Sequence, residues 1–521
     1  MLRLHDPFDF RVRETPDAEF AVFDGKRTTY GEAALEVHRL ANALLAAGLQ
    51  RGDRFAYLSK NSTEYAFMFL AASKVGAVPV PLNYRLAPPE WQYIIDDAKA
   101  RLLIARGEYV AAIEPVRAQL ATVERCVALA VPDAPAGWEC YEAFVGAAPT
   151  TAPDVHVTAD DDLYQMYTSG TTGRPKGAVL AQGAVMAQLA QASFALDSTP
   201  GERALVVAPM YHAAAAIMTF STVWYGGSLF IQGDFHPVHA VRAMSDERIG
   251  RALLVPAMIQ ACLVMVPDVA ERKYDALRYI VYGASPISEA TLARAMQVFG
   301  CDFLQGYGMT ETTAAVTYLL PSDHRRALAG KPELLLSAGR AMVGTEVRVV
   351  DGQDRPLPPG EVGEIVARGP QLMRGYWNLP EASREALRGG WMHTGDAGRM
   401  DADGYLYISD RVKDMIVSGG ENVYPREVEE VLFQHAAIAD VAVIGVPDEK
   451  WGESVKAIVV LREGAAATAD EILAHCHGRL AGYKRPRSVD FVAVLPRNPS
   501  GKVLKRELRE PHWAGHTRRV S

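Results

Sequence analysis

Apolar segments of strand length alternate with segments of helical periodicity along the first part of the chain, and this alternation limits the possible folds most. The segments Arg54–Ser59 and Val78–Leu82 are short and largely apolar, as buried strands are. The segments Thr29–Leu49 and Ser62–Val75 carry apolar residues at helical spacing. Strands that alternate with helices predict an α/β fold in which doubly wound parallel sheets are covered by helices.

The same alternation continues farther along the chain. Helical spacing recurs at Gly183–Leu196 and Ile287–Phe299, and strand-like apolar runs recur at Arg203–Ala208 and Cys301–Leu304. The sheets are therefore expected to extend over this region as well.

One long stretch, Ala204–Gly233, contains no Asp, Glu, Lys or Arg. It does not fit a membrane span, because Pro209 and the pair Gly226 and Gly227 would end a helix before it crossed a bilayer. A buried helix that leads into a strand at Ser228–Gln232 fits the pattern better. No membrane span is expected.

The pattern changes after Thr345, where two valine-rich strand segments, Thr345–Asp351 and Gly363–Arg368, flank a turn rich in Pro and Gly. This predicts a smaller all-β subdomain. After Asp410 the chain has the length and pattern of a separate α+β module. Its expected elements are helix Pro425–Phe433, strands Val441–Val446 and Val455–Leu461, helix Ala469–Leu480 and strand Val489–Leu495. We predict a large N-terminal domain, residues 1–410, and a small C-terminal domain, residues 411–521.

Composition excludes several classes of function. The net charge of the chain is −8 and there is no basic excess, so no nucleic acid is expected as a partner. The five cysteines lie far apart without a C-x-x-C pair, which argues against a zinc or redox site. The N-terminal residues carry charges throughout and lack the apolar core of a secretory signal. We expect a cytoplasmic protein, and the oligomeric state stays open, with a homodimer as one candidate.

The segment Tyr167–Gly177 reads YTSGTTGRPKG and follows the largely apolar stretch Leu163–Met166. Its glycines let the backbone come close to an anion, while its hydroxyl groups and Lys176 supply donors and charge. It is not the Walker phosphate loop, because Pro175 precedes this lysine and a glycine follows it. Taken alone, such a composition is more typical of a flexible surface loop.

Four further motifs follow the loop. They are QGYGMTET at Gln305–Thr312, GWMHTGDAG at Gly390–Gly398, DRVKDMIVSGGENVYP at Asp410–Pro425 and PRNPSGKVLKR at Pro496–Arg506. With the loop, they make the chain resemble the adenylate-forming superfamily, and within it the acyl-CoA synthetases, over nearly all of its length. Five motifs in the family's order are far more specific than any one of them.

The resemblance implies a site for ATP and Mg²⁺. It assigns the loop from Thr168 to Lys176 to the phosphate oxygens, Thr310 to the α-phosphate and Glu311 to the metal, a role that suits a hard oxygen ligand. Glu311 could instead serve only as a helix-capping residue beside Thr310. The implied nucleotide-binding residues of the loop are Thr168, Ser169, Gly170, Thr171, Thr172, Gly173 and Lys176.

The resemblance also implies an adenine and ribose site. Tyr307 offers a flat face to the base, and the implied neighbours of the nucleotide are Gly283, Ala284, Ser285, Gln305 and Gly306. Asp396 would accept hydrogen bonds from the ribose hydroxyls, with Arg411 in support. An aspartate in a TGD sequence is also a common turn residue, and Arg411 could be a surface charge.

By resemblance, the C-terminal domain is mobile. Lys502 would be the catalytic lysine that bridges carboxylate and α-phosphate during adenylation, and Lys413 would be the hinge. In the turned state Gly420 would line the path of the coenzyme A thiol. Two positions depart from the family: Val417 stands where some members have a second lysine, and Gln182 stands where a histidine is frequent.

The resemblance places the acyl pocket behind the PMYH segment, where His212 would lie near the substrate carboxylate. A lone histidine is more often a satisfied core residue, so this alternative stays open. Long-chain enzymes of the family often have a gating tryptophan four residues after this histidine, and here that residue is Ala216. Small residues leave volume for an aryl, alicyclic or medium-chain acid. The other expected pocket residues are Tyr211, Ala213, Ile217 and Gly308.

The motifs therefore predict an enzyme, an AMP-forming acyl-CoA synthetase. It would convert a carboxylic acid (fatty, aryl or alicyclic), ATP and coenzyme A into an acyl-CoA through an acyl-adenylate, releasing AMP and pyrophosphate. One alternative is a ligase that loads the acyl group on a carrier protein rather than on free coenzyme A. Another is a catalytically silent nucleotide-binding module, against which the presence of Lys502 and Glu311 argues.

Overall fold

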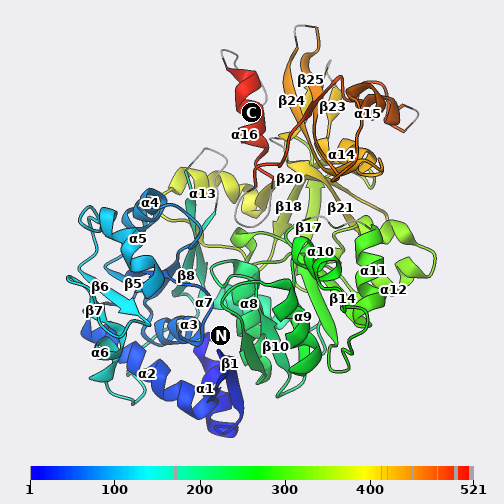
Figure 1. Ribbon diagram of the computed structural model, residues 1–521. Coiled ribbons are helices and arrows are strands. Elements are labelled where there is room, and N and C mark those ends of the chain that lie inside the picture. Colours follow the sequence, from blue (N-terminus) through cyan, green and yellow to red (C-terminus); the bar gives the residue numbers. More distant parts are fainter. Residues whose placement is uncertain are drawn as a thin grey trace. The chain divides into compact units, whose positions relative to one another are not determined.

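Five β-sheets with flanking helices make up the described part of the chain (Figure 1). The computed structural model describes residues 2–168, 174–285, 287, 289–411, 414–418, 421–448, 450–477, 479–497 and 503–514. The chain divides into two compact units: unit 1 is Met1–Val347 with Ala367–Met392, and unit 2 is Arg348–Val366 with His393–Ser521. The domain border at residues 410 and 411 stays a prediction.

The largest sheet of unit 1 is nine-stranded. Its strand order is β16 (Arg340–Ala341), β15 (Thr317–Leu319), β14 (Asp302–Tyr307), β13 (Tyr279–Gly283), β12 (Ile249–Leu253), β10 (Arg203–Val206), β11 (Ser228–Ile231), β1 (Glu19–Phe23) and β2 (Lys26–Thr29). The six strands from β14 to β1 run parallel, and antiparallel strands close both edges.

A second, wholly parallel sheet and a small antiparallel sheet complete the strands of unit 1. The parallel sheet has the order β4 (Val78–Pro81), β3 (Arg54–Leu58), β5 (Leu102–Arg106), β6 (Arg125–Leu129) and β7 (Glu139–Cys140). The small sheet has the order β19 (Gly375–Tyr376), β9 (Lys176–Ala181) and β8 (Asp162–Thr168). The prediction of a mixed α/β fold with parallel sheets is confirmed.

The helices of unit 1 alternate with its strands along most of the chain. They are α1 (His5–Glu14), α2 (Tyr30–Ala46), α3 (Thr63–Val75), α4 (Pro88–Ala98), α5 (Gly107–Arg117), α6 (Tyr141–Gly146), α7 (Gln182–Ala192), α8 (Ala213–Tyr225), α9 (Pro237–Asp246), α10 (Pro256–Met265), α11 (Glu289–Phe299), α12 (Pro321–Leu328) and α13 (Pro380–Ala386). The 3-10 turns are η1 (Thr310–Thr312), η2 (Pro332–Leu336) and η3 (Arg388–Gly390).

Helix α3 begins where the Ser62 hydroxyl accepts a hydrogen bond from the Tyr65 backbone N–H, and it ends at the left-handed Gly76. Because it is apolar around its circumference, α3 forms a central part of the hydrophobic core.

The charge-free stretch Ala204–Gly233 folds as expected. It contains β10, the buried helix α8 and then β11. Among the helices of the described ranges, none is both long and apolar enough to cross a membrane.

Unit 2 contains two sheets. The first has the order β17 (Glu346–Val350), β18 (Gly363–Arg368), β20 (Met392–Met400) and β21 (Leu406–Arg411). The second has the order β23 (Glu421–Val423), β22 (Ile416–Ser418), β25 (Gly452–Leu461) and β24 (Ile438–Asp448), with β26 (Ser488–Phe491) beside β25. Its helices are α14 (Pro425–Phe433), α15 (Ala469–His475) and α16 (Lys505–Trp513).

The predicted elements of the C-terminal module are confirmed in type and order, with two corrections in length. The strand predicted over Val489–Leu495 is too long, since β26 ends at Phe491. The helix predicted over Ala469–Leu480 is too long, since α15 ends at His475. There the Cys476 and His477 N–H groups donate to carbonyls three residues earlier, so the last turn tightens and the helix stops.

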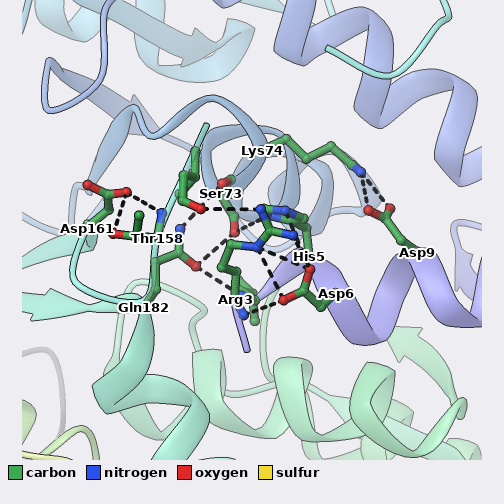
Figure 2. A network of polar contacts seen from close by, with 11 residues as sticks. Arg3, His5, Asp6, Asp9, Ser73, Lys74, Thr158, Asp161 and Gln182 are labelled. Carbon is green, nitrogen blue, oxygen red and sulfur yellow. Dashed lines mark hydrogen bonds and ion pairs between the residues drawn. The ribbon is translucent and has the colours of Figure 1, made fainter. Parts of the chain in front are cut away.

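A buried polar network joins α1 to α3 and α7 (Figure 2). Gln182 is fully buried, and its Oε1 accepts hydrogen bonds from the Leu4 backbone N–H at 2.9 Å and from Ser73 Oγ at 3.0 Å. Ser73 Oγ is in turn 2.9 Å from His5 Nδ1. Because the serine proton goes to Gln182, the His5 Nδ1–H is the donor in this pair. The glutamine at this position therefore has a structural role of its own.

We predict that this network makes stability depend on pH. Burial and the nearby Lys74 and Arg3 cations lower the pKa of His5 to about 4, from an ordinary value of 6.5. The unfolded chain binds a proton there as the pH falls below 6.5 while the folded chain excludes it, so this contribution to stability is present above pH 6.5 and is lost toward pH 4. The urea midpoint of unfolding should therefore fall between pH 7 and pH 5.

The variant His5→Gln tests the origin of this slope. A glutamine amide can still bond to Ser73 but does not titrate, so the midpoint should change less with pH than in the unsubstituted protein. His156→Gln, at an exposed histidine, is the matched control and should leave the slope unchanged. Equal slopes for all three proteins would contradict the prediction.

Candidate active site

The glycine- and threonine-rich loop connects two paired strands of the small sheet. Strands β8 and β9 are antiparallel, with Thr168 opposite Lys176 and Tyr167 opposite Gly177. A Cβ atom on Gly177 would lie 2.6 Å from the Gln165 side-chain nitrogen and 3.1 Å from the Tyr167 ring, so the hairpin closes tightly only with glycine here. The predicted loop residues Ser169, Gly170, Thr171, Thr172 and Gly173 lie outside the described residues.

The Glu311 carboxylate lies directly beside this hairpin. Its Oε1 accepts hydrogen bonds from Thr168 Oγ1 at 3.3 Å and from the Tyr376 hydroxyl at 2.8 Å. The ammonium of Lys176 lies 5.1 Å from the centroid of the Tyr376 ring. Glu311 is only 4% exposed, so a carboxylate at this point depends on such donors. The structure thus brings Glu311, from the motif QGYGMTET, close to Thr168 and Lys176, from the motif YTSGTTGRPKG.

The Glu311 backbone is fixed by the segment around η1. Its carbonyl accepts the Met373 N–H at 2.8 Å, and the Thr313 hydroxyl donates to the Gln371 carbonyl at 2.5 Å. Thr310 begins this single turn. The described hydrogen bonds of the Glu311 carboxylate come from side chains of β8 and β19, whereas a capping residue would accept from backbone N–H groups of its own helix. Helix capping therefore does not explain the position of Glu311.

Two parallel strands of the large sheet end next to each other at the predicted adenine site. In the register of β13 and β14, Gly283 is opposite Gly306. A Cβ atom on Gly283 would lie 2.2 Å from the Gly306 carbonyl oxygen, which explains the glycine. Ala284 follows with a left-handed φ of 66°, and Tyr307 ends β14. Carboxyl ends of parallel strands are where α/β folds bind ligands.

The remaining predicted residues of these segments occupy the same strand ends. Ser285 follows Ala284, Gln305 lies in β14, and Gly308 directly follows this strand. A Cβ atom on Gly308 would lie 2.5 Å from the Ala314 carbonyl oxygen. Ala314 itself has a φ of 106°, so the backbone folds back sharply against Gly308.

His212 lies at the N-terminus of α8, in a segment held by Asn61. The Asn61 amide donates to the Ala208 carbonyl at 3.0 Å and accepts the Met210 N–H at 2.8 Å. Burial and the charge of Arg85 lower the pKa of His212 to about 4. The imidazole is therefore neutral at pH 7, and its Nε2 has no hydrogen-bond partner among the described residues. This is what a substrate-facing imidazole would need, although the described hydrogen bonds do not connect it to Glu311.

The other predicted pocket residues divide into two sets. Ala213, Ala216 and Ile217 lie buried on α8. The Tyr211 ring packs into the core of the parallel five-stranded sheet, with its centroid 5.4 Å from that of Tyr84. If the predicted acyl pocket lies beside α8, Tyr211 would line it on the side of this core.

Asp396 and Arg411 belong to unit 2 and are opposite each other in its first sheet. Strands β20 and β21 are antiparallel, and Asp396 pairs with Arg411 in the register. The Asp396 backbone N–H donates to Thr394 Oγ1 at 3.1 Å, and the side chain is nearly buried. The structure describes only the backbone of Arg411. Lys413, Gly420 and Lys502 lie outside the described residues, and their roles stay predictions.

Two residues at these sites were missed by the sequence analysis. Tyr376 lies in the two-residue strand β19, which is too short to produce a periodic pattern. Asn61 lies just before the cap of α3, where a polar residue has an ordinary local explanation. Only long-range pairing brings either of them to the site.

Comparison with known proteins gives a consistent result. The family model for the AMP-binding enzyme matches residues 8–377, and the model for the AMP-binding enzyme C-terminal domain matches residues 427–502. The chain is 41% identical over 500 residues to a feruloyl-CoA synthase of Amycolatopsis sp, covering 96% of this chain and 97% of the relative. It is 39% identical over 534 residues to a fatty acid–[acyl-carrier-protein] ligase of Streptomyces coeruleorubidus, covering all of both chains.

A third relative and two solved structures agree with this. A long-chain fatty acid–CoA ligase of Mycobacterium tuberculosis is 38% identical over 491 residues, with 94% of both chains covered. ATP-bound MatB from Rhodopseudomonas palustris has a TM-score of 0.88 at 29% identity, covering 99% of this chain and 100% of the other. An anthranilate CoA ligase in complex with anthranoyl-AMP has a TM-score of 0.87 at 27% identity, covering 98% and 97%. This chain belongs to the AMP-binding enzyme family.

Proposed function

We infer that this chain is an acyl-CoA synthetase of the AMP-forming type. The single observation that carries the inference from the structure is the contact between Thr168 and Glu311, which joins the loop expected at the phosphates to the carboxylate expected at the metal. Relatives with about 40% identity over almost the full length are named as acyl-CoA or acyl-carrier ligases, which supports the same class.

The proposed reaction has two steps. A carboxylate oxygen of the acid attacks the α-phosphorus of ATP, and the bond to pyrophosphate breaks. The sulfur of coenzyme A then attacks the carbonyl carbon of the acyl-adenylate, and AMP leaves with the electron pair of the broken C–O bond. The first step brings two anions together, so positive charge and hydrogen-bond donors aimed at the phosphates are its main requirement.

Residues of unit 1 can meet this requirement on the phosphate side. Lys176, at one end of the loop, would bind phosphate oxygens, and Thr310 would bind the α-phosphate. The Thr168 hydroxyl, at the other end, has a single proton and would bind a phosphate oxygen after turning away from Glu311. Glu311 is suited to be a Mg²⁺ ligand, because Thr168 and Tyr376 both donate to its Oε1 and thereby orient the carboxylate. When bound, the metal would neutralise charge on the phosphates. A neutral His212 with its proton on Nε2 would orient the acid by donating a hydrogen bond to a carboxylate oxygen.

Residues of unit 2 would supply the remaining functions. Lys502 would contact the carboxylate and the α-phosphate in the first step. We further propose that the domain formed by residues 411–521 then rotates about Lys413, so that Gly420 lines the path of the thiol. Asp396, with Arg411 opposite it, would bind the ribose hydroxyls.

The acid is proposed to be aryl, alicyclic or of medium chain length. The small side chains at Ala213 and Ala216 leave volume at the start of α8, and Ala216 stands where long-chain enzymes often have a gating tryptophan. The feruloyl-CoA synthase among the relatives favours an aromatic acid. The carrier-protein ligase among them keeps a second candidate, transfer to a carrier protein. We propose a cytoplasmic enzyme, with a homodimer as one candidate for its oligomeric state.

A panel of acids tests the proposal. Purified protein is incubated with ATP, Mg²⁺, coenzyme A and one acid at a time, from aryl, alicyclic, medium-chain and long-chain classes. We expect AMP and acyl-CoA in equal amounts with at least one of the first three classes, measured by liquid chromatography and mass spectrometry. Product with a pantetheinylated carrier protein but none with coenzyme A would favour the second candidate. No AMP with any acid and either acceptor would refute both.

Lys502→Ala should separate the two steps. Loss of one charged donor at the α-phosphate should slow adenylation by about 100-fold or more. Thioester formation from a chemically prepared acyl-adenylate and coenzyme A should stay within about threefold, because Lys502 acts in the other step. Lys273→Ala, at an exposed lysine of unit 1, is the control and should affect neither rate. Equal losses in both steps would contradict the assigned role.

Gly308→Ala should damage the site through the backbone. The new Cβ atom would lie 2.5 Å from the Ala314 carbonyl oxygen, so η1 and with it Glu311 must shift. Because displacements near 1 Å in a reacting site are costly, the overall rate should fall by about 10- to 100-fold. Gly146→Ala is the control, since its Cβ atom would meet nothing within 4 Å. Equal activity of both variants would show that this backbone position does not constrain the site.

A further inference from the structure

Helix α4 contacts the chain on both sides of the phosphate loop. The Tyr167 hydroxyl, just before the loop, donates to Asp97 Oδ2 at 2.5 Å. The Tyr93 hydroxyl donates to the carbonyl of Pro175, next to the last residue of the loop, at 3.3 Å. Tyr93 and Asp97 are one helical turn apart and therefore share a face of α4. A single rigid helix thus binds both ends of a segment whose conformation decides how phosphate is held.

Asp97 also binds the third strand of the small sheet. Its backbone carbonyl accepts the Trp377 indole N–H at 3.0 Å. The Trp377 backbone N–H donates to the Gly177 carbonyl at 2.8 Å, and so extends the pairing of β19 with β9. The hairpin that carries the loop is therefore connected to α4 directly, through Tyr167, and indirectly, through Trp377.

These contacts close a ring of five residues, which we call the loop-base ring. Arg54 stacks on Trp377, with its guanidinium carbon 3.6 Å from the ring centroid. Its Nε donates to Gln165 Oε1 at 3.3 Å, and Gln165 Nε2 donates to the Tyr167 hydroxyl at 3.1 Å. The members of the loop-base ring are Arg54, Asp97, Gln165, Tyr167 and Trp377.

The direction of the hydrogen bonds around the ring is fixed. Burial, with the hydrogen bond to Asp97, raises the pKa of Tyr167, so the phenol stays protonated and donates. It can then accept only from Gln165, whose amide orientation is set by Arg54. Arg54 is itself held by Asp162 at 2.7 Å and is 7% exposed. A polar ring with one allowed arrangement resists rotation of the Tyr167 side chain, and Thr168 follows this residue directly.

We propose that the loop-base ring holds the two ends of the phosphate loop in the positions that favour ATP binding, with Asp97 and Tyr167 as positioning residues. The inference rests on the proposed function, since it takes the loop as the site of the triphosphate. None of the five ring residues is assigned a contact with substrate. We expect the ring residues to affect the binding of ATP and not that of the acid, because the strands that they hold, β8 and β9, lead into the loop and not into α8.

Steady-state kinetics and ATP titration calorimetry test the proposal. Tyr167→Phe and Asp97→Ala should each raise the KM and the dissociation constant for ATP by about tenfold, the effect of losing one charge-assisted hydrogen bond. The KM values for the acid and for coenzyme A should stay within about twofold. Asp97→Asn keeps an oxygen acceptor and should restore most of the ATP affinity. The double variant of Tyr167→Phe with Asp97→Ala should be no weaker than either single variant, because both remove the same bond.

Tyr274→Phe is the matched control. It removes a phenol from the same unit, where the Tyr274 hydroxyl donates to the Val269 carbonyl at 2.8 Å, and it should leave the KM for ATP unchanged. An unsubstituted protein that neither binds ATP nor forms AMP would refute the proposed function. An active unsubstituted protein together with an unchanged KM for ATP in Tyr167→Phe, or with equal increases in all three KM values, would overturn the inference about the ring alone.

Discussion

The hydrogen bonds to the Glu311 carboxylate organise the phosphate side of unit 1. Thr168 of β8 and Tyr376 of β19 donate to the same oxygen, and both strands flank β9 in one small sheet. A nearly buried carboxylate is costly unless donors satisfy it, so η1 is stable only where these two hydroxyl groups converge. The ends of the loop and the expected metal ligand therefore cannot move independently. This coupling explains how residues so far apart in sequence come together at the proposed triphosphate site.

Local signals were sufficient to predict most of the fold. Ser62 and Gly76 are the expected cap and stop of α3, and α14 has the predicted bounds, Pro425–Phe433. The helix predicted over Ala469–Leu480 was too long because a tight turn after His475 continues the same apolar spacing. Periodicity reports which residues face the core, and it does not report whether each backbone carbonyl still receives a bond from the fourth residue ahead.

The site was predictable only where a motif spells it out. Thr168, Lys176 and Glu311 were found because their motifs are specific, and the structure places them together. Asn61 was not, since its partners Ala208 and Met210 are 147 and 149 residues away and nothing near Asn61 distinguishes it from a capping residue. Gln182 illustrates the same limit. The motif marked it as a departure, whereas only the folded chain shows that its amide joins α1 to α3.

The two halves of the proposed reaction centre are held by different hydrogen bonds. The ends of the loop and Glu311 are bonded to the small sheet and α4, whereas the segment that carries His212 is bonded to Asn61. Their apolar side chains nevertheless share cores, since α4 and Tyr211 lie in one cluster and β8, β9 and α8 lie in another. The hydrogen bonds given above for the phosphate side do not involve α8, but the centroid of the Tyr164 ring of β8 lies 6.3 Å from that of the Phe220 ring of α8. Substitutions that reshape an acyl pocket without displacing the loop are therefore expected at the start of α8 and not at Phe220. Substitutions at energetically separate sites have nearly additive effects. Such a partial separation would explain how relatives named for feruloyl and for long-chain fatty acids can be about equally similar to this chain, at 41% and 38% identity. Identity over the whole length would then reflect the shared nucleotide chemistry, and we propose that a few side chains at the start of α8 select the acid.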